Sequence, residues 1–151
     1  MTQATPKPPF DWLRWGSVAL AVLGAADSIY LTWIKLYKAQ ALFCSVGGGC
    51  DIVNTSPYSE INGIPIALFG LAAYLLIAAA LVLEDRWELA RAYGPLAVLG
   101  LALTGTLYSA YLTYLELAVI HAICPYCVIS ALLISGILIL AILRLRQMPA
   151  E

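Results

Sequence analysis

Charged side chains are scarce in this sequence. Of its 151 residues, 11% are Asp, Glu, Lys or Arg and 62% are hydrophobic. A soluble domain is nearer about one half apolar and about one quarter charged, so this composition excludes an ordinary soluble protein and indicates an integral membrane protein. No run of basic residues suggests binding to nucleic acid.

The sequence also lacks an internal repeat and a recognisable signal peptide, because its first apolar run is too long for the apolar part of one. Four runs are long enough to cross a membrane as helices, since about 20 residues span the hydrocarbon core. We therefore expect an all-α fold, a four-helix transmembrane bundle at 14–143 between tails at 1–13 and 144–151. The expected spans cover residues 15–37, 65–83, 92–119 and 122–143.

Basic residues are unevenly distributed between the two ends of these spans. Lys35 and Lys38 lie near one end. Because cytoplasmic segments carry an excess of Lys and Arg, both termini and the 84–91 turn should be cytoplasmic. The loop at 38–64 and the turn at 120–124, with all four cysteines, should then be exoplasmic. The six basic residues assigned to the cytoplasmic end are Lys7, Arg14, Arg86, Arg91, Arg144 and Arg146.

The four cysteines form two close pairs. Cys124 and Cys127 enclose Pro125 and Tyr126 at the expected start of the fourth span. Proline suits the first turn of a helix, which places Cys124 near the helix cap and Cys127 one turn inside. The helix N-terminus favours a thiolate there. We interpret this pair as a redox site, with a structural disulfide as the alternative.

Cys44 and Cys50 enclose the segment Ser-Val-Gly-Gly-Gly in the long loop. A bridge over so short a segment stabilises a fold weakly, and three glycines make it mobile. Mobility suits a disulfide that exchanges partners, and a simple loop staple is the alternative. Zinc held by four cysteines would need closer spacing in this pair and a reducing environment, so we expect no metal.

Polar residues near the expected spans are further candidates. Asp27 and Glu116 are acids within spans, where such groups are costly and usually functional or paired. Each indicates either a proton route or a helix–helix hydrogen bond. His121, three residues before Cys124, either tunes a thiolate and moves a proton or is ordinary polar surface.

Several motifs follow the loop pair. They are CDIVNTS, with Ser56 six residues after Cys50, then PIALFG at the start of the second span, then YLELAVIHAICPYC. Over about residues 14–143 the chain thereby resembles the vitamin K epoxide reductase family, in its bacterial disulfide-forming branch without a fused thioredoxin-like domain. The resemblance implies a four-helix bundle around a quinone, with the C-x-x-C pair at its outer end and the loop as a lid.

The resemblance also implies roles for single residues. Cys127 would be the sulfur nearest the quinone, Cys124 would exchange with the loop, and Cys44 and Cys50 would be the shuttle pair. Animal members of the family carry Asn and Tyr at two pocket positions that are apolar here, which favours a simple quinone over an epoxide as the acceptor. The expected pocket positions besides Cys127 are Ser56, Ile66, Phe69 and Ala131.

The implied activity is disulfide bond formation at a bacterial cell membrane. Electrons would pass from a separate, reduced thioredoxin-like (DsbA-like) protein through Cys44/Cys50 and Cys124/Cys127 to ubiquinone, menaquinone or vitamin K. A reductase of vitamin K or its epoxide is the alternative. A structural membrane protein with inert disulfides is the third interpretation.

Overall fold

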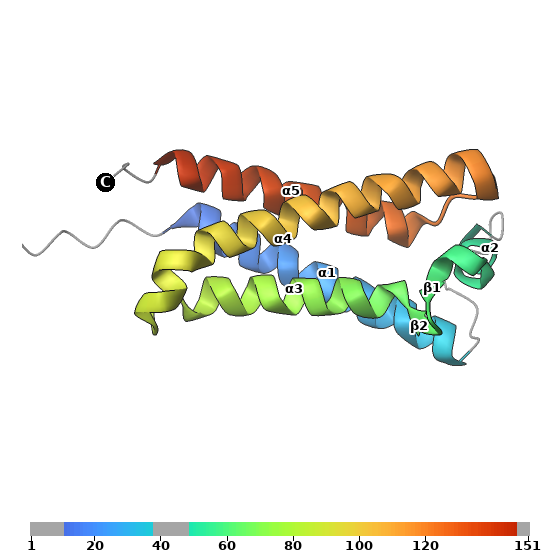
Figure 1. The fold of residues 1–151 in the computed structure, drawn as a ribbon, viewed down its shortest axis with the longest axis horizontal. Helices are drawn as coiled ribbons and strands as arrows, with labels where there is room; N and C mark the ends of the chain where they lie inside the picture. Colours follow the sequence, from blue (N-terminus) through green and yellow to red (C-terminus); the bar gives the residue numbers. More distant parts are fainter. Residues whose placement is uncertain (1–10, 38–48, 148–151) are drawn as a thin grey trace, which may run out of the picture.

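The computed structural model describes residues 11–37 and 49–147. Four long helices lie side by side: α1 (Trp12–Tyr37), α3 (Ile66–Leu83), α4 (Glu88–Leu115) and α5 (Pro125–Gln147) (Figure 1). A π-helical turn, η2 (Glu116–Ile120), extends α4. All four are long and apolar enough to cross a membrane, which confirms the expected all-α transmembrane bundle.

The helices differ at their ends from the expected spans. The first begins at Trp12 because Asp11 caps it, its carboxylate accepting a hydrogen bond of 3.1 Å from the Arg14 backbone N–H. The third begins at Glu88, so the connection after α3 is shorter than the expected 84–91 turn. The fourth begins at Pro125 and continues to Gln147, beyond the expected limit at residue 143.

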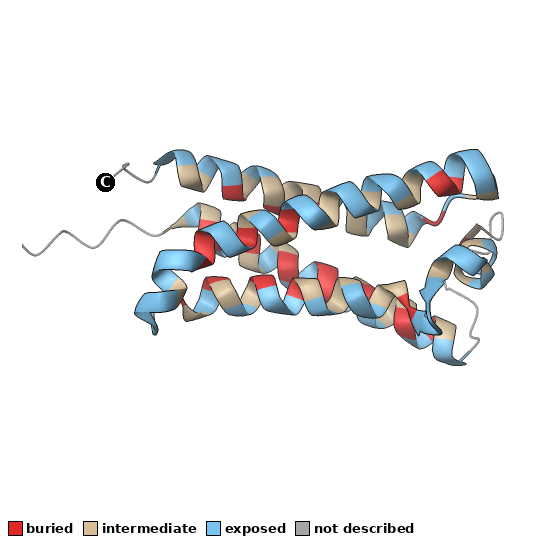
Figure 2. Ribbon diagram, in the orientation of Figure 1, coloured by how far each residue is buried: buried red, intermediate tan, exposed pale blue. Residues whose placement is uncertain are grey.

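The bundle is packed around one fully buried residue from each long helix. These are Ala21 of α1, Ile77 of α3, Ala102 of α4 and Ile137 of α5. Two of the four are alanines, and small side chains let membrane helices approach closely. Figure 2 shows that buried positions recur along each helix between exposed ones, as expected when the outer face meets lipid.

Buried charges close one end of the bundle, which we call the arginine end after Arg14 and Arg144. The Arg144 guanidinium donates two hydrogen bonds to the Glu84 carboxylate, at 2.8 and 2.6 Å, and a third to Asp11 at 2.9 Å. Arg14 donates to Asp85 at 2.9 Å. These contacts join α1, α3 and α5, and they show how charged residues are accommodated at the helix ends.

The opposite end, which we call the cysteine end after Cys50 and Cys124, is covered by the connection from α1 to α3 (Figure 1). That connection contains α2 (Gly49–Thr55), η1 (Pro57–Ser59) and a hairpin of β1 (Glu60–Ile61) and β2 (Ile64–Pro65). The hairpin pairs Ile61 with Ile64 across Asn62 and Gly63, whose φ angles are 52° and 81°. Asn-Gly is a strong hairpin signal, and we had expected only an irregular loop here.

Candidate active site

The C-x-x-C pair lies where the chain turns from η2 into α5. His121 ends η2 in the left-handed region, with φ 54°, and residues 121–124 then lead into the next helix. Pro125 occupies the first turn of α5, and the Val128 N–H donates to the Cys124 carbonyl at 3.1 Å. Cys124 therefore precedes the helix, and Cys127 lies one turn inside it.

The loop helix α2 brings a third cysteine to this pair. The Sγ atoms of Cys50 and Cys124 are 3.4 Å apart, and each residue is 2% exposed. Cys50 is disulfide-bonded, whereas Cys124 and Cys127 are free thiols. Cys44 lies outside the described residues. A thiol in contact with the sulfur of a disulfide is the arrangement from which thiol–disulfide exchange proceeds.

Gly49 allows this close contact between α2 and the segment before α5. A Cβ atom at this position would lie 2.3 Å from the Ile123 carbonyl oxygen, which is far inside van der Waals contact. The neighbouring residue is Cys50, so the absence of a side chain at Gly49 lets the cysteine-bearing turn of α2 rest directly on the backbone beside Cys124. Three consecutive glycines were read from the sequence only as a source of mobility.

Apolar side chains surround the cysteine contact. Ile34, Cys50 and Cys124 form one buried cluster, and Tyr30 and Tyr126 pack against it. The two tyrosine rings lie with their centroids 5.0 Å apart. Because both cysteines are also almost fully buried, their contact lies where water is largely excluded.

The pKa of the Cys124 thiol is lowered, chiefly by a hydrogen bond from the Cys127 side chain. Burial and the nearby Glu116 carboxylate act in the opposite direction. The hydrogen bond favours the Cys124 thiolate, which is the nucleophilic form. Of the two thiols in the motif, the one in contact with Cys50 is thus the better prepared to ionise.

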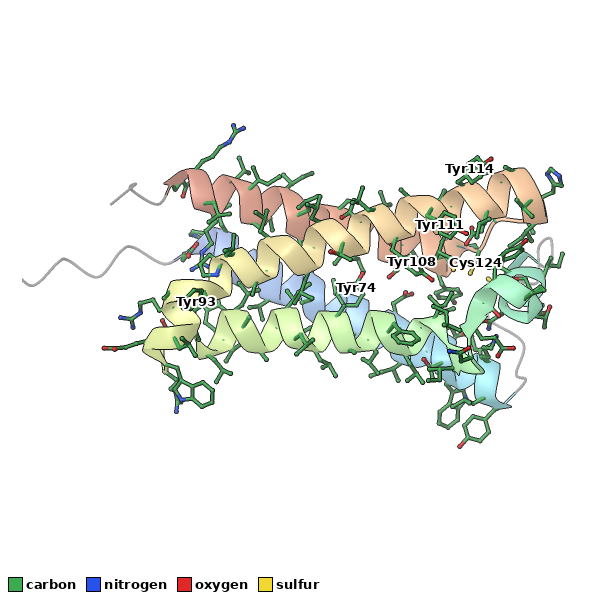
Figure 3. The ribbon with its side chains drawn as sticks, viewed as in Figure 1. Tyr74, Tyr93, Tyr108, Tyr111, Tyr114 and Cys124 are labelled. Carbon is green, nitrogen blue, oxygen red and sulfur yellow. The ribbon has the colours of Figure 1, made fainter. Side chains whose placement is uncertain are left out.

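A cavity of about 290 Å³ lies between the helices, next to the cysteines. Cys50, Cys124 and Cys127 line it, and most of its wall is apolar. Figure 3 shows Cys124 at this end and Tyr74 nearer the middle of the bundle. The cavity has the size and character typical of the smaller ligand sites in proteins.

Three of the four expected pocket positions line the cavity. Ser56, Ile66 and Phe69 are on its wall, and Ser56 also ends α2 by donating its hydroxyl to the Val53 carbonyl at 2.7 Å. Ala131 is not among the described lining residues. On α5 the wall is formed by Cys127, Ser130 and Ile134, and Ala131 is turned about 100° from Ser130 around the helix.

Tyr74 is a lining residue that the sequence reasoning missed. Its hydroxyl donates to the Ser130 carbonyl at 2.9 Å and lies 3.0 Å from the Ser130 hydroxyl, so it joins α3 to α5. The Tyr74 ring occupies the space that a side chain at Gly24 of α1 would fill. Tyr74 is the one hydroxyl-bearing residue in the sequence of α3, and this feature could have marked it as a candidate lining residue.

The three candidate proton-handling residues lie in different surroundings. Glu116 is 3% exposed, lines the cavity and accepts a hydrogen bond from the Cys124 N–H at 3.2 Å. Asp27 is outside the described lining, and one of its buried oxygens has no hydrogen-bond partner in the described part of the chain. His121 is exposed, with its ring 3.1 Å from the Leu117 carbonyl. Only Glu116 is brought to the cysteines.

The profile of the vitamin K epoxide reductase family matches residues 15–142. The thiol-disulfide oxidoreductase LTO1 of Arabidopsis thaliana is 30% identical over 122 residues, an alignment that covers 77% of this chain and 32% of that protein. The chain thus spans about a third of the length of this relative. The family match confirms the family, though not the branch, that the sequence motifs indicated: the chain belongs to the vitamin K epoxide reductase family.

Proposed function

We propose that this protein is a membrane thiol-disulfide oxidoreductase that carries electrons from a reduced thioredoxin-like protein to a quinone. The observation that carries the proposal is the 3.4 Å contact between the sulfurs of Cys50 and Cys124, at one end of an apolar cavity. The Arabidopsis relative is named a thiol-disulfide oxidoreductase, which supports the same class of chemistry in the matched region.

The exchange begins when a thiolate of the donor protein attacks Cys44 in a Cys44–Cys50 disulfide. The Cys50 thiolate that leaves attacks Cys124 in the Cys124–Cys127 disulfide. A Cys50–Cys124 bond forms, and Cys127 leaves as a thiolate. The Cys44 thiol, released from the donor as the donor closes its own disulfide, then attacks Cys50 and releases Cys124.

The cavity beside Cys127 fits the head group of a quinone. Its wall is mainly apolar, as a planar ring requires, and Asn54, Ser130 and Tyr108 supply a few polar groups that can meet ring oxygens. When bound, the quinone would serve as the two-electron acceptor. The surrounding residues hold the ring beside Cys127 and exclude water, while Cys124 and Cys127 close their disulfide.

The cysteine end is proposed to face the exoplasmic side, with both termini in the cytoplasm. Arg14 and Arg144 are at the opposite end of the bundle, as an excess of basic residues on the cytoplasmic side requires. The donor would then be a separate, DsbA-like protein outside a bacterial cell membrane. A membrane-impermeant thiol reagent should label reduced Cys44 in intact spheroplasts, and labelling only after lysis would reverse this orientation.

The function is tested with the purified protein in detergent. A reduced thioredoxin-like protein should bleach ubiquinone or menaquinone, followed by the quinone's ultraviolet absorbance. Cys127→Ser should abolish bleaching, whereas Ser135→Ala, whose hydroxyl bonds its own helix at Ala131, should not. The proposal would be contradicted if the unmutated protein bleached neither ubiquinone nor menaquinone. If it reduced vitamin K epoxide instead, the alternative reductase function would be favoured.

A further inference from the structure

Glu116 is a buried acid held beside the C-x-x-C motif. Its Oε2 atom accepts the hydrogen bond from the Cys124 N–H at 3.2 Å, and Glu116 and Cys127 line the same cavity. It is the first residue of η2, and its own carbonyl accepts the Ala122 N–H at 3.1 Å. The π-helical turn thus directs the carboxylate toward the cysteines, and such turns are frequent at functional sites.

This position is unfavourable for a residue that serves only the fold. In the described part of the chain, the ion pairs involve Glu84, Asp85, Asp11 and Glu60, and none involves Glu116. Its negative charge opposes ionisation of the adjacent Cys124. A neutral glutamine could accept the same N–H hydrogen bond without that cost, so the acid itself requires a chemical reason.

The chemistry of the proposed reaction needs a proton acceptor at this place. Cys124 is the thiol prepared to ionise, and the Cys127 side chain donates a hydrogen bond to it. When the two close their disulfide, the Cys127 proton must leave Sγ. Among the described candidates, His121 is exposed and Asp27 is not on the cavity wall, whereas Glu116 lines the cavity together with Cys127 and accepts the Cys124 N–H.

We propose that Glu116 is the catalytic base that takes the Cys127 thiol proton and delivers it into the cavity, an inference that rests on the function proposed above. As the Cys124–Cys127 bond forms, two electrons pass to the quinone and the proton moves from Cys127 Sγ to a Glu116 oxygen. That proton then follows the electrons to a quinone oxygen, which restores the carboxylate. One further proton, from water, replaces the one that Cys124 lost on ionising and completes the quinol.

Glu116→Gln in the full-length protein is the primary test. The amide oxygen can still accept the Cys124 N–H, but glutamine cannot take a proton. We expect reoxidation of the reduced enzyme by a water-soluble quinone to slow about a hundredfold in a single turnover, the usual scale of general base catalysis. Exchange with the reduced thioredoxin-like protein should change less than about twofold, because it does not use this proton acceptor. Glu116→Asp should recover part of the lost rate.

A second readout uses no quinone. In a Cys124→Ser background, Cys127 is alkylated through its thiolate, which a neighbouring carboxylate disfavours. Glu116→Gln should therefore make Cys127 alkylate faster at a fixed pH in this background, although it slows reoxidation by quinone in the enzyme that keeps both cysteines. Glu60→Gln, at an acid that pairs with Lys35 outside the cavity wall, is the matched control and should leave both rates unchanged.

The outcomes separate this inference from the function on which it rests. The role of Glu116 as a base would be overturned if the Glu116→Gln variant were reoxidised at the wild-type rate. It would also be overturned if the variant lost exchange and reoxidation to the same extent. Alkylation and reoxidation that slow together would also overturn it, because they indicate a structural role. Failure of the unmutated enzyme to reduce any quinone would instead remove the proposed function.

Discussion

The sulfurs of Cys50 and Cys124 lie 3.4 Å apart although 74 positions separate them in the sequence. Cys50 is carried by α2 and Cys124 by the turn before α5, so the contact joins the loop lid to the membrane bundle. Both residues are buried, and the first is bonded while the second is a free thiol. This contact supports the proposal that Cys50 is the loop sulfur that reacts with the C-x-x-C pair.

Cys44→Ala should trap that reaction. Without Cys44, no thiol remains in the loop to attack Cys50 and resolve the Cys50–Cys124 bond. We expect this bridge to accumulate and to appear as a cross-linked peptide in mass spectrometry. Cys50→Ala, as the reciprocal control, should give no such peptide. A Cys44–Cys124 bridge in the unmutated protein, with no Cys50–Cys124 bridge in the variant, would exchange the roles of the loop cysteines.

Gly49→Ala should separate the two sulfurs without touching either. The added methyl group would meet the Ile123 carbonyl at 2.3 Å, so α2 must move away. Misplacement of reacting groups by about 1 Å can lower a rate on the order of 100-fold, and we expect a loss on that scale in the exchange step measured by stopped flow. Gly100→Ala is the control, since its methyl group would meet no atom within 4 Å. Equal rates in both variants would contradict this assignment.

The lowered pKa of Cys124 has a pH dependence of definite sign. Because the Cys127 side chain stabilises the Cys124 thiolate, that thiolate should persist to lower pH than an ordinary cysteine and be protonated as the pH falls through its lowered pKa. Cys127→Ala removes the donor, so the transition in thiolate ultraviolet absorbance should move to higher pH. Cys127→Ser retains a hydroxyl donor and should move it less. A shift to lower pH in the alanine variant would contradict the assigned cause.

Arg144→Ala should destabilise the bundle from the end opposite the cysteines. It would leave the carboxylate of Glu84, which is 5% exposed, without its bidentate partner. Loss of one member of a buried ion pair costs on the order of 3 kcal/mol, which thermal unfolding in detergent can measure. Arg146→Ala, at an exposed position in the same helical turn, should cost much less. Similar unfolding temperatures for the two variants would show that the buried pair stabilises little.

The sequence by itself determined the helices, the position of the C-x-x-C pair and the family. These follow from local properties, because an apolar run of sufficient length must form a helix in lipid and Pro125 sets a helix start. The Asn62–Gly63 hairpin was equally local and could have been predicted from the same sequence. The end of α5 was less accessible, because Arg144 meets Asp11 and Glu84 only after the bundle has assembled.

Only the tertiary structure decided which residues meet at the site. Two acids in the spans looked equivalent in the sequence, yet η2 turns Glu116 to the cysteines while Asp27 stays off the cavity wall. Likewise, the rotation of α5 places Ser130 rather than Ala131 on that wall. Periodicity gives a helix but neither its rotation against its neighbours nor a contact across 74 positions. Those depend on how the helices pack, and at Gly49 on the absence of a single side chain.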